Sequence, residues 1–139
     1  MSKIPSNSAI VFQAYGQTGI LQECAFALLT LCRQHTREEL ADVEICIYTD
    51  NPAFFRSFKD CWLDLRFREV NPELIRKWRG EIDFLHRVKI EILKDFVAGR
   101  VGQVLYLDTD IYFTRPVTGI FEDIADGIIY MHIMEGLVH

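Results

Sequence analysis

The sequence predicts an α/β protein: a mostly parallel sheet between two layers of helices, in a three-layer α/β/α arrangement. Three observations lead to this class. Strand-like and helix-like segments alternate along the chain, two strand-like segments are apolar almost throughout, and polar residues follow the ends of strands. Continuous apolar strands, as at 9–12 and 104–107, are typical of a sheet covered on both faces. The 139 residues suit a single domain, 1–139.

Each element has its own signal. The segment 20–35 has apolar residues at helical spacing, and 63–71 alternates apolar and polar residues as a half-buried or edge strand does. Two Asn-Pro pairs predict helix starts, with asparagine as the cap and proline in the first turn. The expected strands are 8–16, 43–50, 63–71, 101–113 and 127–134, and the expected helices are 20–35, 51–58, 71–78, 83–99 and a short helix or turn at 115–124.

The helix at 83–99 is expected to begin at Asp83 and to stop at Gly99. A helical wheel gives it one apolar face, made of Leu85, Val88, Ile92, Leu93 and Phe96.

Lys89 falls inside this apolar face. A lysine in such a position either extends its ammonium group to solvent or meets a negative partner. Asp108, Asp110 or a bound phosphate are the partners that we expect, and the solvent alternative stays open.

The composition excludes some classes of partner. The formal net charge of −5 argues against nucleic acid or an anionic membrane surface, because both select basic patches. No segment approaches the roughly 20 apolar residues of an integral membrane span, and no N-terminal segment has signal-peptide form. The four cysteines form no zinc motif and are expected to be buried free thiols. These features fit a cytoplasmic protein.

The stretch "VLYLDTDIYF" at 104–113 carries the strongest chemical signal. If the strand persists, Asp108 and Asp110 present two carboxylates on one side. Their repulsion is relieved by protonation, by a basic partner or by a divalent cation, for which oxygen ligands without Cys or His favour Mg²⁺ or Mn²⁺. The alternative is that both residues cap a turn through local backbone hydrogen bonds.

Together, "VLYLDTDIYF", the preceding "HRVKIEILKDF" and the opening order of "AIVFQAYG", a long helix and "VEICIYTDNP" resemble the nucleotide-diphospho-sugar glycosyltransferases of GT-A fold. The resemblance covers essentially the whole chain. It implies that Asp110 is the main ligand of Mn²⁺ or Mg²⁺. It also implies that Asp108 contacts the ribose or shares the metal.

The resemblance further implies a nucleotide pocket at the ends of the first two strands. Ala14, Tyr15 and Gly16 would line it, with Tyr15 stacked on the base, and Asp50 would lie near the base. Lys89 occupies the place of a basic residue that faces the phosphates. Tyr15 as a plain strand-end aromatic and Asp50 as a helix cap remain alternatives.

The implied function is transfer of a sugar from a nucleotide-diphospho-sugar, with a UDP-sugar as the working assumption, to an unidentified hydroxyl acceptor. GT-A enzymes usually carry a second half with the acceptor site, so we expect a donor-binding portion that is truncated at its C-terminus and that lacks turnover by itself. No catalytic residue is assigned. His132 and Glu135 follow the last expected strand and could face the acceptor side, where Glu135 is a weak candidate and His132 is better explained as a packed strand residue. A homo-oligomer through an exposed C-terminal part is a further option.

Two other functions compete with this one. In a haloacid-dehalogenase-like phosphatase, Asp108 would be the nucleophile and Asp110 a general acid. That family has small residues and threonine after the motif, whereas Ile111-Tyr112-Phe113 follow here. The other alternative is a nucleotide-binding fragment that has the fold without catalysis.

Overall fold

A computed structural model describes residues 4–58 and 61–129, which form one sheet flanked by helices. Within this part of the chain the sheet has four strands in the order β3-β2-β1-β4, and all neighbouring pairs are parallel. The mostly parallel sheet is thus confirmed. The strands are β1 (Ala9–Gln13), β2 (Glu44–Thr49), β3 (Leu65–Glu69) and β4 (Val104–Leu107). The helices are α1 (Thr18–Gln34), α2 (Pro52–Arg56), α3 (Pro72–Arg79), α4 (Arg87–Val97) and α5 (Thr118–Ala125).

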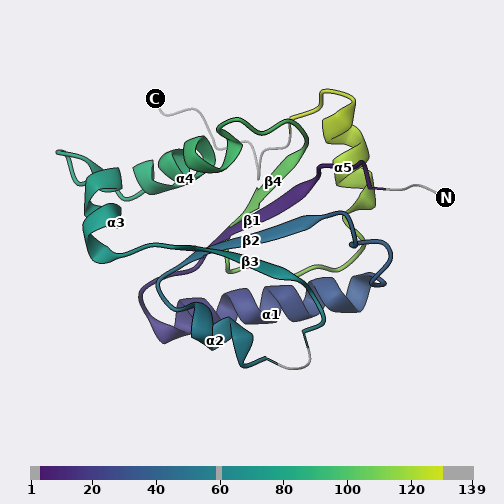
Figure 1. The fold of residues 1–139 in the computed structure, drawn as a ribbon, viewed down its shortest axis with the longest axis horizontal. Coiled ribbons are helices and arrows are strands. Elements are labelled where there is room, and N and C mark those ends of the chain that lie inside the picture. Colours follow the sequence, from purple (N-terminus) through teal and green to yellow (C-terminus); the bar gives the residue numbers. More distant parts are fainter. Residues whose placement is uncertain (1–3, 59–60, 130–139) are drawn as a thin grey trace, which may run out of the picture.

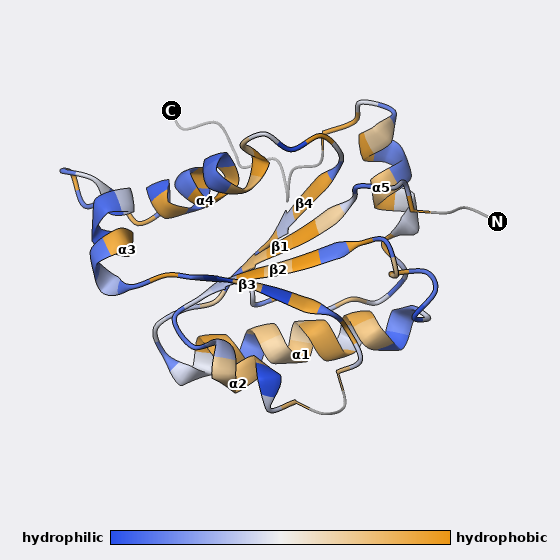
Figure 2. Ribbon diagram, viewed as in Figure 1, coloured by the Kyte–Doolittle hydropathy of each residue, from blue (hydrophilic) through white to orange (hydrophobic). Residues whose placement is uncertain are grey.

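The sheet separates two hydrophobic cores. Figure 1 shows α1 and α2 on one face of the sheet and α3 and α4 on the other. Along β1, Ile10 and Phe12 pack into the α1 core, whereas Ala9 and Val11 pack into the α4 core. All four side chains are fully buried, and Figure 2 shows the resulting run of hydrophobic colour along the central strands. The continuous apolar pattern therefore arises because both faces of β1 are covered.

Both Asn-Pro helix starts are confirmed. The Asn51 side chain accepts a hydrogen bond from Phe54 N–H at 3.2 Å, and Asn71 accepts one from Leu74 N–H at 2.8 Å. Each side chain satisfies a backbone donor that the first helical turn leaves free. The edge position expected for 63–71 is also correct, since β3 pairs only with β2 among the described strands.

The expected start of the fourth helix is wrong. The helix begins at Arg87 instead of Asp83, because Asp83 adopts a left-handed φ of 52° and its carboxylate meets Arg79 at 2.7 Å. Leu85 consequently lies outside the buried face, with 52% of its surface exposed. Val88, Ile92 and Phe96 are buried as expected.

The last strands also differ from expectation. β4 ends at Leu107, where its pairing with β1 ends opposite Phe12, so Asp108 and Asp110 follow the strand instead of lying on it. Beyond Gln13 the first strand continues toward β2 alone, with Ala14 N–H donating to the Tyr48 carbonyl. The helix expected at 115–124 is confirmed as α5. Of the strand expected at 127–134, residues 127–129 form none and the remainder lies outside the described residues.

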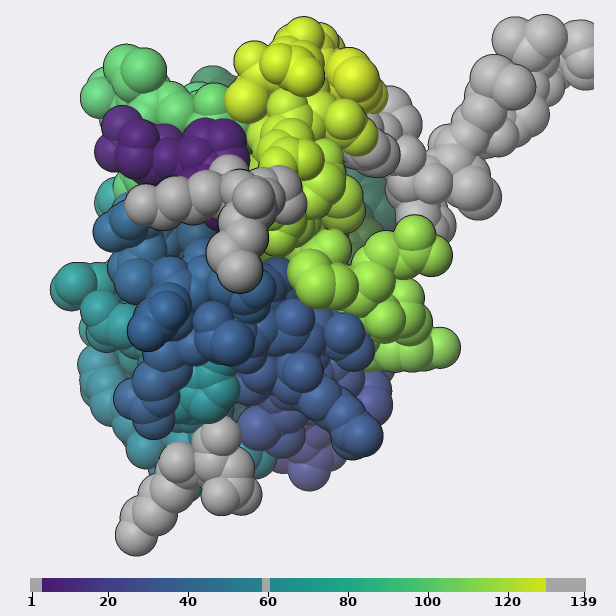
Figure 3. Space-filling model, turned by 90° about the vertical axis from the view of Figure 1, so that its right-hand side faces the viewer, coloured from purple at the N-terminus to yellow at the C-terminus, as the bar shows by residue number. Residues whose placement is uncertain are grey.

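The segment after the aspartates packs along α1, as Figure 3 shows for the light green and yellow residues beside the blue end of that helix. Phe113 N–H donates to Thr30 Oγ1 at 3.0 Å, and Val117 N–H donates to His35 Nε2 at 3.1 Å. Val117 and Phe121 enter the α1 core. These contacts hold the chain after the Asp-Thr-Asp turn, and the pairing of β4 with β1 holds the chain before it.

Candidate functional site

The Asp-Thr-Asp turn lies at the carboxyl edge of the sheet, beside the end of β1. The first turns of α1 and α4 reach the same edge, because each helix follows a strand or loop on that side. Together these elements enclose an open cavity of about 510 Å³. Six ionisable side chains line it: Tyr15, Glu23, His86, Lys89, Asp108 and Asp110.

Lys89 reaches into this cavity and binds Asp108. Its Nζ lies 2.8 Å from Asp108 Oδ1, with 35% of the lysine side chain and 52% of the aspartate side chain exposed. The prediction that Lys89 turns toward the Asp108 end of the sheet is confirmed. Buried Val88 and Ile92 on either side fix the helix face that carries the lysine. At this exposure the ion pair contributes little to stability, so its main effect is to place a positive charge in the cavity.

Asp110 lies at the same cavity with a different environment. Among the described residues its carboxylate has no ion-pair partner. Asp108 and Asp110 both line the cavity from the segment after β4, so strand alternation does not determine where they lie.

Glu23 was not predicted as a site residue. Its Oε2 accepts a hydrogen bond from Thr109 Oγ1 at 3.2 Å, which ties the middle of the Asp-Thr-Asp turn to α1. A third carboxylate therefore borders the cavity. Nothing in the sequence pairs residues 23 and 109, which become neighbours only through the β1–β4 pairing.

His86 also lines the cavity without having been predicted. It is the residue before α4 and precedes Lys89 by one helical turn. That i, i+3 spacing to Lys89 was the signal in the sequence that could have identified His86.

Asp108 and Asp110 could hold a divalent cation only together with water or ligand oxygens. Within 4–58 and 61–129, no group of three or more His, Cys, Asp or Glu side chains is arranged as a metal site. Mg²⁺ and Mn²⁺ commonly use one or two carboxylates and complete their shell with water and phosphate oxygens. Asp110 is available for this role, and Asp108 would divide its two oxygens between the cation and Lys89.

Three further residues expected at the site, Ala14, Tyr15 and Gly16, lie in the loop after β1, each in a different environment. Tyr15 lines the cavity, and its hydroxyl oxygen accepts a hydrogen bond from Gln13 Nε2 at 3.2 Å. Burial raises the pKa of Tyr15, an effect that the Gln13 hydrogen bond and the Arg79 charge partly offset. Ala14 is fully buried in the α1 core and does not line the cavity. Its expected contact with a nucleotide therefore has no support in its position.

Gly16 and Asp50 are joined by a hydrogen bond. Gly16 has a φ of 94°, which favours glycine, and its N–H donates to Asp50 Oδ2 at 3.1 Å. Asp50 follows β2, so this hydrogen bond joins the loops after β1 and β2. Neither residue lines the cavity that contains Lys89 and Asp108.

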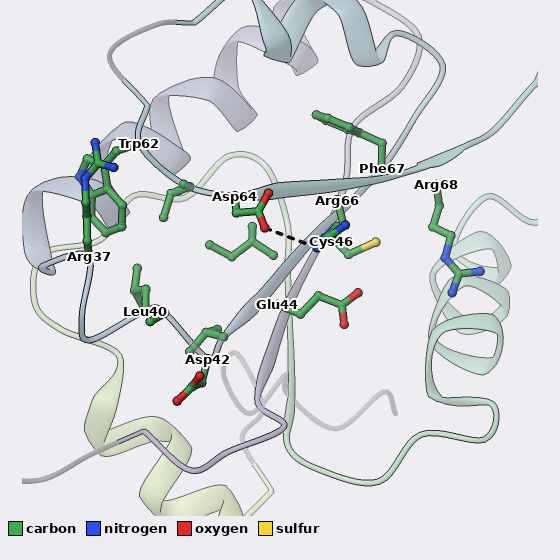
Figure 4. Close-up of a pocket in the computed structure, with 14 residues that line it drawn as sticks. Arg37, Leu40, Asp42, Glu44, Cys46, Trp62, Asp64, Arg66, Phe67 and Arg68 are labelled. Carbon is green, nitrogen blue, oxygen red and sulfur yellow. Dashed lines mark hydrogen bonds and ion pairs between the residues drawn. The ribbon is translucent and has the colours of Figure 1, made fainter.

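A larger cavity, of about 690 Å³, lies along β2 and β3 and does not include Asp108 or Asp110 (Figure 4). Several of its charged groups already have partners, inside the cavity or next to it: Glu44 pairs with Arg100 and Arg68 with Asp95. Arg66 lies 3.5 Å from Asp64, and the Arg37 guanidinium stacks over Trp62 at 5.8 Å. It contains none of the residues that the sequence singled out. The carboxyl-edge cavity is therefore the candidate site despite its smaller volume.

Comparison with known proteins finds no matching family model, no matching curated protein and no matching solved structure. In the part of the chain that the structure describes, no helix has both the length and the apolar character needed to span a membrane.

Proposed function

We propose that the chain binds a nucleotide-diphospho-sugar at the carboxyl-edge cavity and forms the donor site of a GT-A-like glycosyltransferase. One observation carries this proposal: Lys89, Asp108 and Asp110 line one cavity at the carboxyl edge of a parallel sheet. This edge is where α/β proteins place their ligands. One ammonium group and two carboxylates at the same cavity suit a ligand that brings both a diphosphate and a divalent metal.

Each side chain has a separate role in the proposed complex. The Lys89 ammonium group moves from Asp108 toward the diphosphate and neutralises part of its charge. Asp108 and Asp110 hold the cation, which when bound would withdraw charge from the departing diphosphate. Tyr15 offers its ring to the base, and the Gly16–Asp50 hydrogen bond keeps the Tyr15 loop in place.

In the proposed reaction, an acceptor hydroxyl oxygen bonds to the anomeric carbon while the bond from that carbon to the diphosphate breaks. The diphosphate leaves as an anion, and the hydroxyl proton passes to a base. We assign no base, so the stereochemical course is open. A reducing cytoplasm is the compartment that we propose, and the four free cysteines are compatible with it.

The first test is calorimetric titration of the 139-residue chain with uridine diphosphate, with and without Mn²⁺. We expect binding that strengthens at least tenfold when Mn²⁺ is present. Asp110→Asn keeps the shape of the side chain but removes the charge, so it should abolish the Mn²⁺ effect and leave the fold intact. Adenosine and guanosine diphosphates in the same titration report the base preference.

Asp64→Asn is the matched control, because Asp64 is an exposed carboxylate beside the other cavity. It should bind the nucleotide as the wild type does. If Asp110→Asn retains both the affinity and the Mn²⁺ dependence of the wild type, the metal assignment is wrong. Absence of nucleotide binding by the wild type at millimolar concentration would contradict the whole proposal.

A further inference from the structure

A second chemical feature lies on the opposite side of the molecule from α4, between α1 and the segment that precedes β3. Cys32, near the end of α1, and Cys61, four residues before β3, bring their sulfur atoms to 3.9 Å. The two residues are 29 positions apart in the chain. Their contact is therefore created by the packing of this segment on α1.

The four cysteines differ in accessibility. Cys24 and Cys46 are buried, with at most 1% of their surface exposed, whereas Cys32 and Cys61 are both partly exposed. An oxidant in solution can therefore reach the Cys32–Cys61 pair but not the other two thiols in the folded state. The pair is also the one place among the described residues where two sulfur atoms are in contact.

The two sulfur atoms are in van der Waals contact. A disulfide bond is about 2.0 Å long, so the two sulfur atoms have to approach by roughly 2 Å. Cys61 lies in irregular structure after α2, where a small backbone shift breaks no helix or sheet hydrogen bonds. Cys32 is fixed on α1, so the movement falls on the Cys61 side.

We propose that Cys32 and Cys61 form a reversible disulfide when the glutathione pool becomes oxidised, and that this bond clamps the segment before β3 onto α1. One protein thiolate attacks oxidised glutathione, forms a mixed disulfide and releases one glutathione. The second protein thiolate then attacks the protein sulfur of that mixed disulfide and releases the other glutathione. Two protein thiols lose two electrons and two protons in total, and one oxidised glutathione becomes two reduced molecules.

The environment sets the rate of this reaction. Burial raises the pKa of Cys32 to about 11, the neighbouring Cys61 adds to the shift, and backbone N–H groups of Trp62 and Leu63 partly offset it. Because the thiolate is the reacting form, attack by Cys32 should be slow at pH 7 and should accelerate by up to about tenfold per pH unit as pH rises. When Cys32 attacks first, the disulfide would form under prolonged oxidising conditions but not during a brief exposure.

The test uses the full chain, incubated at pH 8 with oxidised glutathione, quenched by alkylation and mapped by mass spectrometry. We expect one intramolecular Cys32–Cys61 disulfide, with Cys24 and Cys46 alkylated only after unfolding. Closing a loop of this length should raise the Tm by roughly 10 °C, and dithiothreitol should reverse the increase.

Cysteine variants show which thiols cause the oxidation-dependent change in Tm. Cys32→Ser and Cys61→Ser should each lose the oxidation-dependent change in Tm, whereas Cys24→Ala and Cys46→Ala should keep it. The peptide map of the wild type does not depend on whether any variant folds. Stable glutathione adducts without the protein disulfide, or a Cys32–Cys61 bond that leaves the Tm unchanged, would overturn the proposal. Neither measurement involves the carboxyl-edge cavity, so this inference stands or falls independently of the proposed function.

Discussion

Lys89 shows how a single residue departs from the pattern of its element for a reason that lies elsewhere in the chain. The helix around it buries Val88, Ile92 and Phe96, and a fourth apolar residue at position 89 would extend that face. A lysine there costs some apolar contact. The Asp108 carboxylate, 2.8 Å away, receives the ammonium group at the edge of the core, so the charge of Lys89 stays partly exposed and paired.

Lys89→Met tests the charge at nearly constant volume. Without ligand, the free energy of unfolding should change by less than about 1 kcal/mol, because the ion pair with Asp108 is partly exposed. Affinity for a nucleotide diphosphate should fall roughly tenfold or more, since a buried or half-buried phosphate contact is lost. Urea unfolding and calorimetric titration measure the two quantities.

Lys94→Met is the control for Lys89→Met. Lys94 belongs to the same helix, pairs with Glu91 at 3.2 Å and exposes 67% of its side chain. Its replacement should leave the nucleotide affinity unchanged. Equal losses in both variants would mean that the effect is the net charge of the helix and not the position of Lys89.

At the scale of elements, one buried histidine contributes to the attachment of α5 to α1, beside the packing of Val117 and Phe121 in the α1 core. His35 Nε2 accepts a hydrogen bond from Val117 N–H at 3.1 Å, so the ring proton must be on Nδ1, which lies 3.1 Å from the Leu31 carbonyl oxygen. The neutral ring thus joins the end of α1 to the start of α5. Both contacts require this one tautomer.

His35→Ala should destabilise the protein by about 2–4 kcal/mol, because it leaves the Val117 N–H without a partner and creates a cavity. Urea unfolding gives the total effect, and hydrogen exchange of the Val117 amide shows whether the loss occurs at α5. His86→Ala, at an exposed position, should change stability by no more than about 0.5 kcal/mol. If Val117 exchanges no faster in His35→Ala, the histidine does not hold α5.

At the scale of the whole molecule, several weak acids are buried on both sides of the sheet. Burial raises the pKa of Cys24 to about 12 and that of Cys46 to about 11. It also raises the pKa values of Tyr48, whose hydroxyl donates to Asp95, and of Tyr106, which lies near the Asp108 charge. The folded state therefore keeps these protons at a pH where the unfolded chain has lost them.

Stability should consequently fall as pH rises from about 9, the ordinary thiol value, to about 11. Below pH 9 both states bind these protons, so these groups contribute no slope. Above it the unfolded state binds fewer protons, and each group lowers the free energy of unfolding by up to about 1.4 kcal/mol per pH unit. Urea unfolding under reducing conditions at pH 8, 9, 10 and 11 measures the slope.

Cys24→Ala supplies the comparison for this slope, because it removes one titrating thiol from the α1 core. The variant should be less stable than the wild type at pH 8, and its stability should decline less steeply with pH. Parallel curves for the two proteins would show that other groups cause the alkaline loss.

The sequence by itself determined the class of fold and most of its elements. Apolar periodicity is a local property that reflects which faces are covered, so the buried strands and α1 could be placed within a few residues. The Asn-Pro helix starts were equally local, since cap and proline act within one turn. Lys89 could be singled out because its conflict with the apolar face is visible in the helix alone. The GT-A assignment and its sugar nucleotide stay predictions.

The tertiary structure decided where strands end and which side chains meet. β4 pairs with β1 only as far as Phe12↔Leu107, whereas β1 stays paired with β2 beyond that point, and no local pattern contains this difference. Asp83 lies outside the helix, in the segment between α3 and α4, where it adopts a left-handed φ of 52°. Glu23 joins Thr109, Cys32 meets Cys61 and His35 receives Val117 across separations of 29 to 86 residues. Such contacts depend on the order of strands in the sheet, and that order becomes fixed only when both cores are packed.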